Sequence, residues 1–158
     1  MHPSGADAEE TQGLRETMRS FLFVPADSER KLAKGPLSGA DGLILDLEDS
    51  VATDRKKVAR EMALAYLEAN DRKGPKLYVR VNALDTGLTL SDLAIVMQGK
   101  PDGIVFPKCI GQKDIDLLAT YLDAFEAREG IGTGTTRILT IATESAAAIL
   151  ALTAAPAK

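Results

Sequence analysis

Five short apolar runs recur along this chain, and they constrain its fold more than any other feature of the sequence. Each run has the length and the bounding residues of a β-strand. The runs are Ser20–Ala26, Gly42–Leu47, Lys76–Asn82, Asp102–Pro107 and Arg137–Glu144. The starts of consecutive runs are about 22 to 35 residues apart, which is enough for a crossover helix between parallel strands. The sequence therefore predicts a parallel sheet whose faces are both covered.

Segments between the runs carry apolar side chains at helical spacing. The first predicted buried face comprises Val58, Met62, Ala65, Tyr66 and Ala69, and the second comprises Ile115, Leu118, Leu122 and Phe125. Strands and helices therefore alternate. Both a doubly wound sheet and a (β/α)8 barrel agree with this alternation.

Polar side chains follow the apolar runs and favour the barrel. These residues are Glu48, Asp49, Arg80, Asn82, Lys108 and Glu144. The carboxyl ends of parallel strands meet at one edge, where a barrel builds its site from several strand ends. No glycine-rich phosphate loop follows any of the runs. We therefore predict an α/β fold of the (β/α)8 TIM-barrel type, of which this chain holds about the first five β/α units.

The length of the chain sets the predicted domain organisation. A complete barrel needs about 250 residues, whereas this chain has 158. We expect a flexible leader over residues 1–18 and an incomplete barrel domain over residues 19–158. Because an open sheet edge promotes aggregation unless it is covered, we expect a fragment, a truncated gene product or a chain that pairs with another protein.

Composition excludes several classes of function. A net charge of -4 with four Phe and three Tyr argues against a nucleic-acid partner. No apolar run is long enough to span a membrane and no secretory signal is visible, so we expect a cytoplasmic protein. One cysteine, Cys109, and one histidine, His2, leave no internal disulfide, no zinc site and no serine or cysteine hydrolase triad.

Five motifs occur in a fixed order along the chain. They are RSFLFVP at Arg19–Pro25, DLED at Asp46–Asp49, VRVN at Val79–Asn82, DGIVFPK at Asp102–Lys108 and IATES at Ile141–Ser145. Together they resemble the citrate lyase beta subunit and related CoA-ester lyases of the HpcH/HpaI aldolase superfamily. The resemblance implies a (β/α)8 barrel, a divalent cation that is usually Mg²⁺, and a homo-oligomer, commonly a trimer or hexamer. It also implies cleavage or formation of a carbon–carbon bond in an acyl-CoA thioester of the malyl, citramalyl or citryl type.

The resemblance assigns roles to particular residues. Glu144 would be a Mg²⁺ ligand close to the substrate, and Arg80 would bind the substrate's carboxylate and oxyanion. Glu48 and Asp49 would complete the catalytic set as the acidic pair that supports the water shell of the metal. The CoA phosphates would contact Arg30, Lys31 and Lys34. The family's second metal-binding aspartate, after the sixth strand, has no counterpart here.

Each of these residues also has a structural interpretation. Glu144 could stabilise a helix N-terminus, and Glu48 with Asp49 could begin a helix. However, Asp46 and Glu48 share a strand face, and inward carboxylates are costly unless they are paired or bind a metal. Arg80 could pair with them as a structural ion pair. The acidic surroundings would raise the pKa of Lys108, which argues against a Schiff-base role.

The sequence leaves three functions open. The first is a Mg²⁺-dependent carbon–carbon lyase. The second is a non-catalytic remnant or assembly subunit that pairs with a complete homologue. The third is a metal-dependent aldolase for free 2-oxo acids, which would need a histidine base although the sequence offers only His2.

Overall fold

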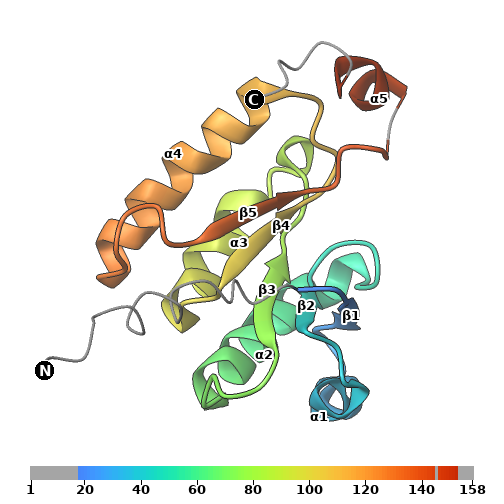
Figure 1. The fold of residues 1–158 in the computed structure, drawn as a ribbon, viewed down its shortest axis with the longest axis vertical. Helices are drawn as coiled ribbons and strands as arrows, with labels where there is room; N and C mark the ends of the chain where they lie inside the picture. The colour runs from blue at the N-terminus through green and yellow to red at the C-terminus, as the bar shows by residue number, and fades with distance from the viewer. Residues whose placement is uncertain (1–17, 145, 153–158) are drawn as a thin grey trace, which may run out of the picture.

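A computed structural model describes residues 18–144 and 146–152 of the chain, and the predicted leader apart from Met18 lies outside this part. Five strands form one parallel sheet in the order β1-β2-β3-β4-β5 (Figure 1). The strands are β1 (Phe21–Pro25), β2 (Gly42–Asp46), β3 (Lys76–Arg80), β4 (Gly103–Phe106) and β5 (Arg137–Thr140). The prediction of five parallel strands is confirmed.

Helices connect the strands. They are α1 (Glu29–Lys34), α2 (Lys56–Ala69), α3 (Thr89–Val96), α4 (Gln112–Glu129) and α5 (Ala146–Leu152), with short 3-10 helices η1 (Gly35–Ser38), η2 (Thr53–Arg55), η3 (Leu84–Thr86) and η4 (Met97–Gly99). The strands lie side by side in chain order without a reversal, as in a barrel, whereas a doubly wound sheet reverses its strand order. The architecture is therefore that of part of a TIM-type barrel.

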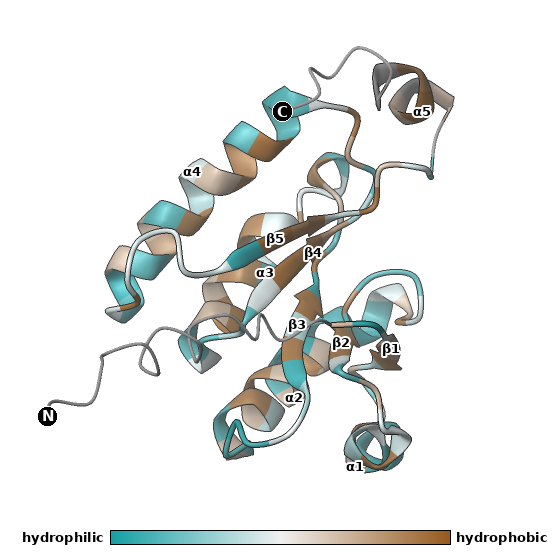
Figure 2. Ribbon diagram, viewed as in Figure 1, coloured by the Kyte–Doolittle hydropathy of each residue, from teal (hydrophilic) through white to brown (hydrophobic). Residues whose placement is uncertain are grey.

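Most of the core lies between the sheet and the helices. Alternate residues of the strands, such as Leu45, Val79 and Ile104, pack against Leu93 of α3 and Leu118 of α4. Figure 2 shows the strands β3 to β5 as mainly hydrophobic, whereas α4 carries both hydrophobic and hydrophilic residues along its length. This difference is expected for a sheet with buried strands and a helix with one solvent-facing side.

The predicted buried face of α4 is confirmed, but that of α2 is partly wrong. In α2 the buried residues are Ala59, Ala63 and Leu67, while Ala65 and Ala69 are exposed. The small side chains of the two buried alanines let the helix lie close to its neighbours. A Cβ added to Gly99 of η4 would lie 2.6 Å from the Cβ of Leu67, which shows how closely η4 approaches α2.

The opposite face of the sheet carries a second, smaller apolar cluster. Ile44, Tyr78 and Val105 form its buried centre, and Met18 and Ile141 pack against it. On β1, Phe21 and Phe23 are partly exposed, and Phe21 meets the Tyr78 ring edge-on at 5.3 Å. Within the described residues, β1 and β5 each pair with one neighbouring strand, so their outer edges are open. No helix in this part of the chain is long and apolar enough to cross a membrane.

Candidate functional site at the carboxyl edge of the sheet

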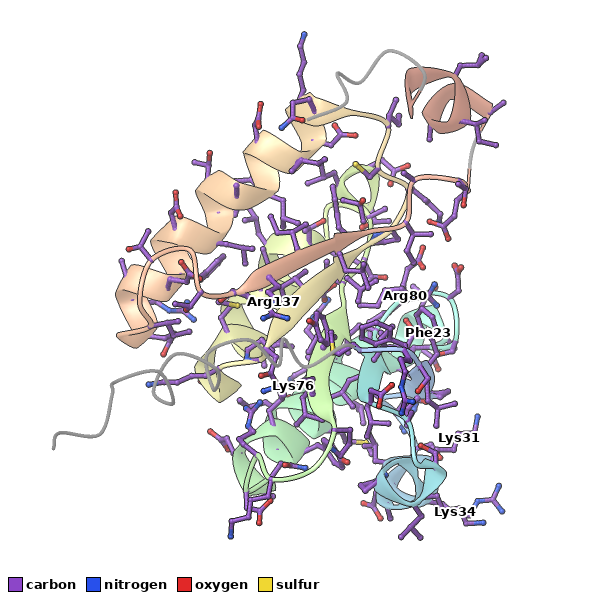
Figure 3. The ribbon with its side chains drawn as sticks, viewed as in Figure 1. Phe23, Lys31, Lys34, Lys76, Arg80 and Arg137 are labelled. Carbon is purple, nitrogen blue, oxygen red and sulfur yellow. The ribbon has the colours of Figure 1, made fainter. Side chains whose placement is uncertain are left out.

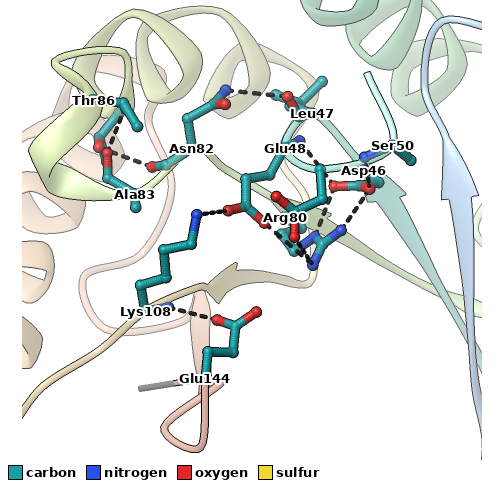
Figure 4. Close-up of polar contacts among 12 residues, drawn as sticks. Asp46, Leu47, Glu48, Ser50, Arg80, Asn82, Ala83, Thr86, Lys108 and Glu144 are labelled. Carbon is teal, nitrogen blue, oxygen red and sulfur yellow. Dashed lines mark hydrogen bonds and ion pairs between the residues drawn. The ribbon is translucent and has the colours of Figure 1, made fainter. Parts of the chain in front are cut away.

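The last residues of β2 and β3 begin the candidate site. Asp46 and Arg80 are paired in register on these neighbouring strands. The guanidinium of Arg80 donates two parallel hydrogen bonds to the carboxylate of Asp46, from Nε and from Nη2, both of 2.7 Å (Figure 4). The backbone N–H groups of Glu48 and Ser50 donate to the same carboxylate at 2.9 and 3.1 Å. Asp46 is therefore fully engaged.

The surroundings of this pair determine the charge of Asp46. Burial raises the pKa of its carboxyl group, but the hydrogen bonds from Arg80, Ser50 and Glu48 outweigh burial, so the net pKa is lowered. The guanidinium of Arg80 also lies over the ring of Phe23, 4.7 Å from its centroid. Asp46 holds the guanidinium of Arg80 in position, although the family resemblance assigned no role to Asp46. The signal that could have revealed it is its position opposite Arg80 in the register.

Glu48 lies in the turn after β2 and is 3% exposed. Its Oε2 is 3.2 Å from Nη1 of Arg80, and its Oε1 is 2.8 Å from Nζ of Lys108. These contacts are ion pairs by distance, but neither oxygen accepts a hydrogen bond of regular geometry. Ion pairs do not require directional donors, so the two cations compensate the charge of Glu48. Glu48 is thus buried and ion-paired, and neither of its oxygens has a regular hydrogen bond.

Two side chains that the resemblance did not identify hold the turn that carries Glu48. The ammonium of Lys56 donates to the carbonyls of Leu47 and Glu48, both at 2.7 Å. The side-chain amide of Asn82 donates to the carbonyl of Leu47 at 3.2 Å. Backbone carbonyls accept from any suitable donor, so the sequence contained no specific signal for the role of Lys56.

Lys108 follows β4 and links the cluster to the next strand. Its backbone is left-handed, with φ of 53°, which is uncommon for a residue other than glycine. Its backbone N–H donates to Oε2 of Glu144 at 2.7 Å, while its ammonium reaches Glu48. The contact with Glu48 raises the pKa of Lys108, as the sequence predicted. An amine held as ammonium is a poor nucleophile, so a Schiff-base role is disfavoured.

The carboxylates of Glu48, Asp49 and Glu144 converge at this edge. One oxygen from each lies within 4.8 Å of the others, with Asp49 and Glu144 exposed to solvent and Glu48 buried. Glu48 and Asp49 come from the turn after β2, and Glu144 comes from the segment after β5. Figure 4 shows Lys108 between Glu48 and Glu144. The structure therefore brings together Arg80, Glu48, Asp49 and Glu144, four of the residues predicted for the site.

The basic residues predicted for CoA binding lie elsewhere. Arg30, Lys31 and Lys34 are all exposed on α1. Figure 3 shows the side chains of Lys31 and Lys34 projecting outward from α1, away from Arg80 and Phe23. Their positions leave them accessible to a ligand but outside the carboxylate cluster.

The donor set of the cluster fits a hard divalent cation. Mg²⁺ prefers oxygen ligands and is usually held by one or two carboxylates, with water and substrate oxygens in the other positions. Glu48 offers two buried oxygens without a hydrogen bond, while Asp49 and Glu144 offer solvent-facing oxygens. A buried carboxylate is costly unless it is compensated, and Glu48 is compensated here by two cations without a regular hydrogen bond.

A hollow of about 300 Å³ lies at the opposite, amino-terminal edge of the sheet, and its lining includes Lys76, Arg137 and Asp102. Figure 3 labels Lys76 and Arg137. Here Asp102 accepts the backbone N–H of Leu77 at 2.8 Å. It supplies a single carboxylate, already engaged, among several cations. This hollow is not a candidate for a metal site.

The chain is similar in sequence to known proteins. The sequence profile of the family described as HpcH/HpaI aldolase/citrate lyase matches residues 19–155. A (3S)-malyl-CoA thioesterase of Cereibacter sphaeroides is 39% identical over 104 residues, 66% of this chain and 36% of that protein. Citrate lyase subunit beta of Escherichia coli is 37% identical over 99 residues, 63% and 33% of the two chains. The human mitochondrial citramalyl-CoA lyase is 34% identical over 103 residues, 64% and 30%. The matched region thus spans about a third of the length of these relatives.

Solved structures show the same fold. RipC of Yersinia pestis aligns with a TM-score of 0.62 and 28% identity, over 86% of this chain and 51% of that chain. The protein CitE of Mycobacterium tuberculosis, in complex with magnesium and acetate, aligns with a TM-score of 0.65 and 26% identity, over 88% and 50%. A malate synthase of Haloferax volcanii, in a magnesium and glyoxylate complex, aligns with a TM-score of 0.75 over 89% and 47%. At 18% identity this last likeness concerns the fold alone.

Proposed function

Because the chain belongs to the HpcH/HpaI aldolase/citrate lyase family, we propose that it supplies part of the active site of a Mg²⁺-dependent carbon–carbon lyase. The proposed substrates are acyl-CoA thioesters of the malyl, citramalyl or citryl type. One observation carries the proposal: oxygens of Glu48, Asp49 and Glu144 gather within 4.8 Å beside the guanidinium of Arg80. The magnesium in the CitE complex supports the choice of metal.

The carboxylates have different parts in this proposal. Glu144 would be the Mg²⁺ ligand, as the family resemblance implies, and the backbone N–H of Lys108 fixes its orientation. Glu48 and Asp49 would hold the water molecules around the ion. When bound, Mg²⁺ would polarise an oxygen of the 2-oxo or 2-hydroxy acid portion of the substrate.

Arg80 is the proposed substrate-binding cation. Its Nε and Nη2 are used by Asp46, which leaves Nη1 directed at the carboxylate cluster. A guanidinium held rigidly by a buried carboxylate is preorganised to bind a substrate carboxylate and to offset negative charge that develops on an oxygen. The exposed residues Arg30, Lys31 and Lys34 of α1 would then bind the CoA phosphates.

A second candidate function is assembly with a homologous chain. The observation in its favour is the partly exposed apolar side chains at both open edges of the sheet, Phe23 on β1 and Leu139 on β5. Unpaired strand edges with apolar side chains are templates for another chain. Homo-oligomerisation and a cytoplasmic location remain predictions alongside both candidates.

The test of the lyase proposal measures metal binding and turnover. The chain would be titrated with Mn²⁺, a paramagnetic substitute for Mg²⁺, and a full-length version of the enzyme would be incubated with malyl-CoA and citramalyl-CoA in the presence of Mg²⁺. We expect Glu144→Gln to weaken Mn²⁺ binding by the chain about tenfold or more, and to abolish turnover in a full-length version of the enzyme. The matched control is Glu61→Gln, which removes an exposed carboxylate from α2.

The product identifies the bond that is cleaved. Carbon–carbon cleavage leaves an acyl-CoA and a 2-oxo acid, whereas hydrolysis frees the CoA thiol. Both are assayed because one matched relative is named a (3S)-malyl-CoA thioesterase. Mn²⁺ binding that Glu144→Gln leaves unchanged would contradict the metal assignment. Release of free thiol without 2-oxo acid would contradict the lyase assignment.

A further inference from the structure

Lys108 contacts two of the clustered carboxylates through two different groups. Its backbone N–H holds Glu144 at 2.7 Å, and its ammonium lies 2.8 Å from Oε1 of Glu48. The left-handed backbone of Lys108, with φ of 53°, accompanies both contacts. A non-glycine residue in this conformation is a local strain of the kind that clusters at functional sites.

Charge balance explains why the ammonium is needed. Asp46, Glu48, Asp49 and Glu144 place four carboxylates at this edge. Arg80 donates to Asp46 through two of its nitrogens, so it compensates Glu48 only through Nη1 at 3.2 Å. The ammonium of Lys108 is the nearer cation to Glu48, and its contact is to the other oxygen.

We propose that the ammonium of Lys108 is a built-in counter-ion of Glu48, and that it occupies the place beside Glu48 where the hydrated divalent cation would lie. A hydrated cation that approaches Glu48 must displace this ammonium, while the backbone N–H of the same residue keeps Glu144 in position. This inference rests on the proposed metal site and describes how access to that site is controlled.

The geometry supports displacement. The three carboxylate oxygens lie within 4.8 Å of one another, so a cation among them would lie a few ångströms from an ammonium that is 2.8 Å from Glu48. Like charges at such a distance repel strongly even near solvent. The Lys108 side chain is 47% exposed and has a flexible stem, so it can move into solvent when the cation arrives.

The first experiment compares Mn²⁺ affinities of the 158-residue chain by titration, with free Mn²⁺ measured by electron paramagnetic resonance. We expect Lys108→Met to bind Mn²⁺ about tenfold more tightly than the wild type, because the competing charge is gone. Lys108→Arg should restore the weaker binding. The matched control is Lys100→Met, because Lys100 is also exposed and left-handed, with φ of 49°, but lies at the opposite edge of the sheet.

The second experiment tests the counter-ion without metal. In a thermal double-mutant cycle, Lys108→Met should lower the Tm by about 2 °C in the wild type and leave it unchanged in a Glu48→Gln background. A Tm loss that persists in that background would overturn the counter-ion role, whatever the metal result. If the cycle shows that Lys108 and Glu48 are coupled, but Lys108→Met leaves the Mn²⁺ affinity unchanged or weakens it, the proposal that the cation displaces the ammonium would be overturned.

The two proposals fail differently. If the pair is coupled but neither the wild type nor Lys108→Met binds Mn²⁺, the metal site of the proposed function is wrong and displacement falls with it. If Glu144→Gln abolishes Mn²⁺ binding while Lys108→Met leaves the affinity unchanged, the metal site stands and only the role of Lys108 falls.

Discussion

Two buried carboxylates lie near the ends of β2 and β3, and their surroundings differ. Asp92, at 0% exposure, accepts hydrogen bonds on both oxygens: one from Nε of Arg60 at 2.6 Å, and two of 2.7 Å from the backbone and side chain of Asn82. Glu48, at 3% exposure, accepts no regular hydrogen bond and is compensated by the nearby charges of Arg80 and Lys108. Burial is nearly the same, but Asp92 is satisfied by hydrogen bonds, whereas Glu48 is compensated by ion pairs alone.

We expect this difference to separate a structural carboxylate from a functional one. Asp92 joins α3 to α2 and to the end of β3 through hydrogen bonds. Asn82 connects the two sites, because its side-chain amide donates both to Asp92 and to the carbonyl of Leu47. The hydrogen bonds of Asp92 therefore hold Asn82, which in turn holds the backbone of the turn that carries Glu48. Buried polar groups left partly unsatisfied are the ones to examine for ligands.

The largest effect expected from this comparison is on Asp92. Asp92→Ala leaves the Arg60 guanidinium and two donors of Asn82 without their acceptor in the interior. We expect the free energy of unfolding to fall by about 3 to 5 kcal/mol, as when one partner of a buried ion pair is removed. Urea denaturation measures it, with the exposed Asp123→Ala as the control. A loss below about 1 kcal/mol would mean that Asp92 is not a structural carboxylate.

A smaller effect is expected on the pH dependence of stability. It tests Asp46, the fully hydrogen-bonded carboxylate of the candidate site. Because its folded pKa lies below the ordinary 3.8, Asp46 stabilises the chain above that value and loses this contribution as the pH falls through the folded pKa. The wild type should therefore have a higher Tm than Asp46→Asn at about pH 5, and the difference between the two Tm values should decrease toward about pH 3. A gap that stays constant across this range would show that the ionised carboxylate does not stabilise the fold.

The smallest effect on stability is expected at Glu48. Glu48→Gln removes a buried charge together with its ion pairs, and the gain in desolvation offsets the loss of attraction. The free energy of unfolding should stay within about 0.5 kcal/mol of the wild type, while Mn²⁺ affinity should fall. The same urea series that measures Asp92→Ala provides the comparison. If Glu48→Gln destabilised the chain as much as Asp92→Ala, the distinction between the two carboxylates would be lost.

Much of the candidate site followed from the sequence, for a topological reason. Once the apolar runs are assigned to parallel strands, their carboxyl ends must meet at one edge. That rule places Arg80, Glu48, Asp49 and Glu144 at the same edge, whereas the distances between them come from the structure. Strand assignment needed only local patterns of apolar residues.

Other features could not be predicted, because they depend on distances and angles between elements. The buried face of α2 shifted to Ala59 and Ala63 because close packing favoured small side chains over the regular apolar spacing. The left-handed backbone of Lys108 has no signature in the sequence, since lysine rarely adopts it. Lys56 donates to two backbone carbonyls, and since every residue has a backbone carbonyl, the sequence does not show which ones it binds.

The sequence by itself determined the order of strands and helices, the parallel sheet and the set of charged residues at its carboxyl edge. These follow from apolar periodicity and chain direction, which are properties of neighbouring residues. Only the tertiary structure decided which charge meets which: Asp46 engages Arg80, Asp92 engages Arg60, and Glu48 keeps its oxygens free of hydrogen bonds. The reason is that hydrogen bonds and ion pairs depend on ångström-scale positions, which packing sets between residues 32 to 34 positions apart in the chain.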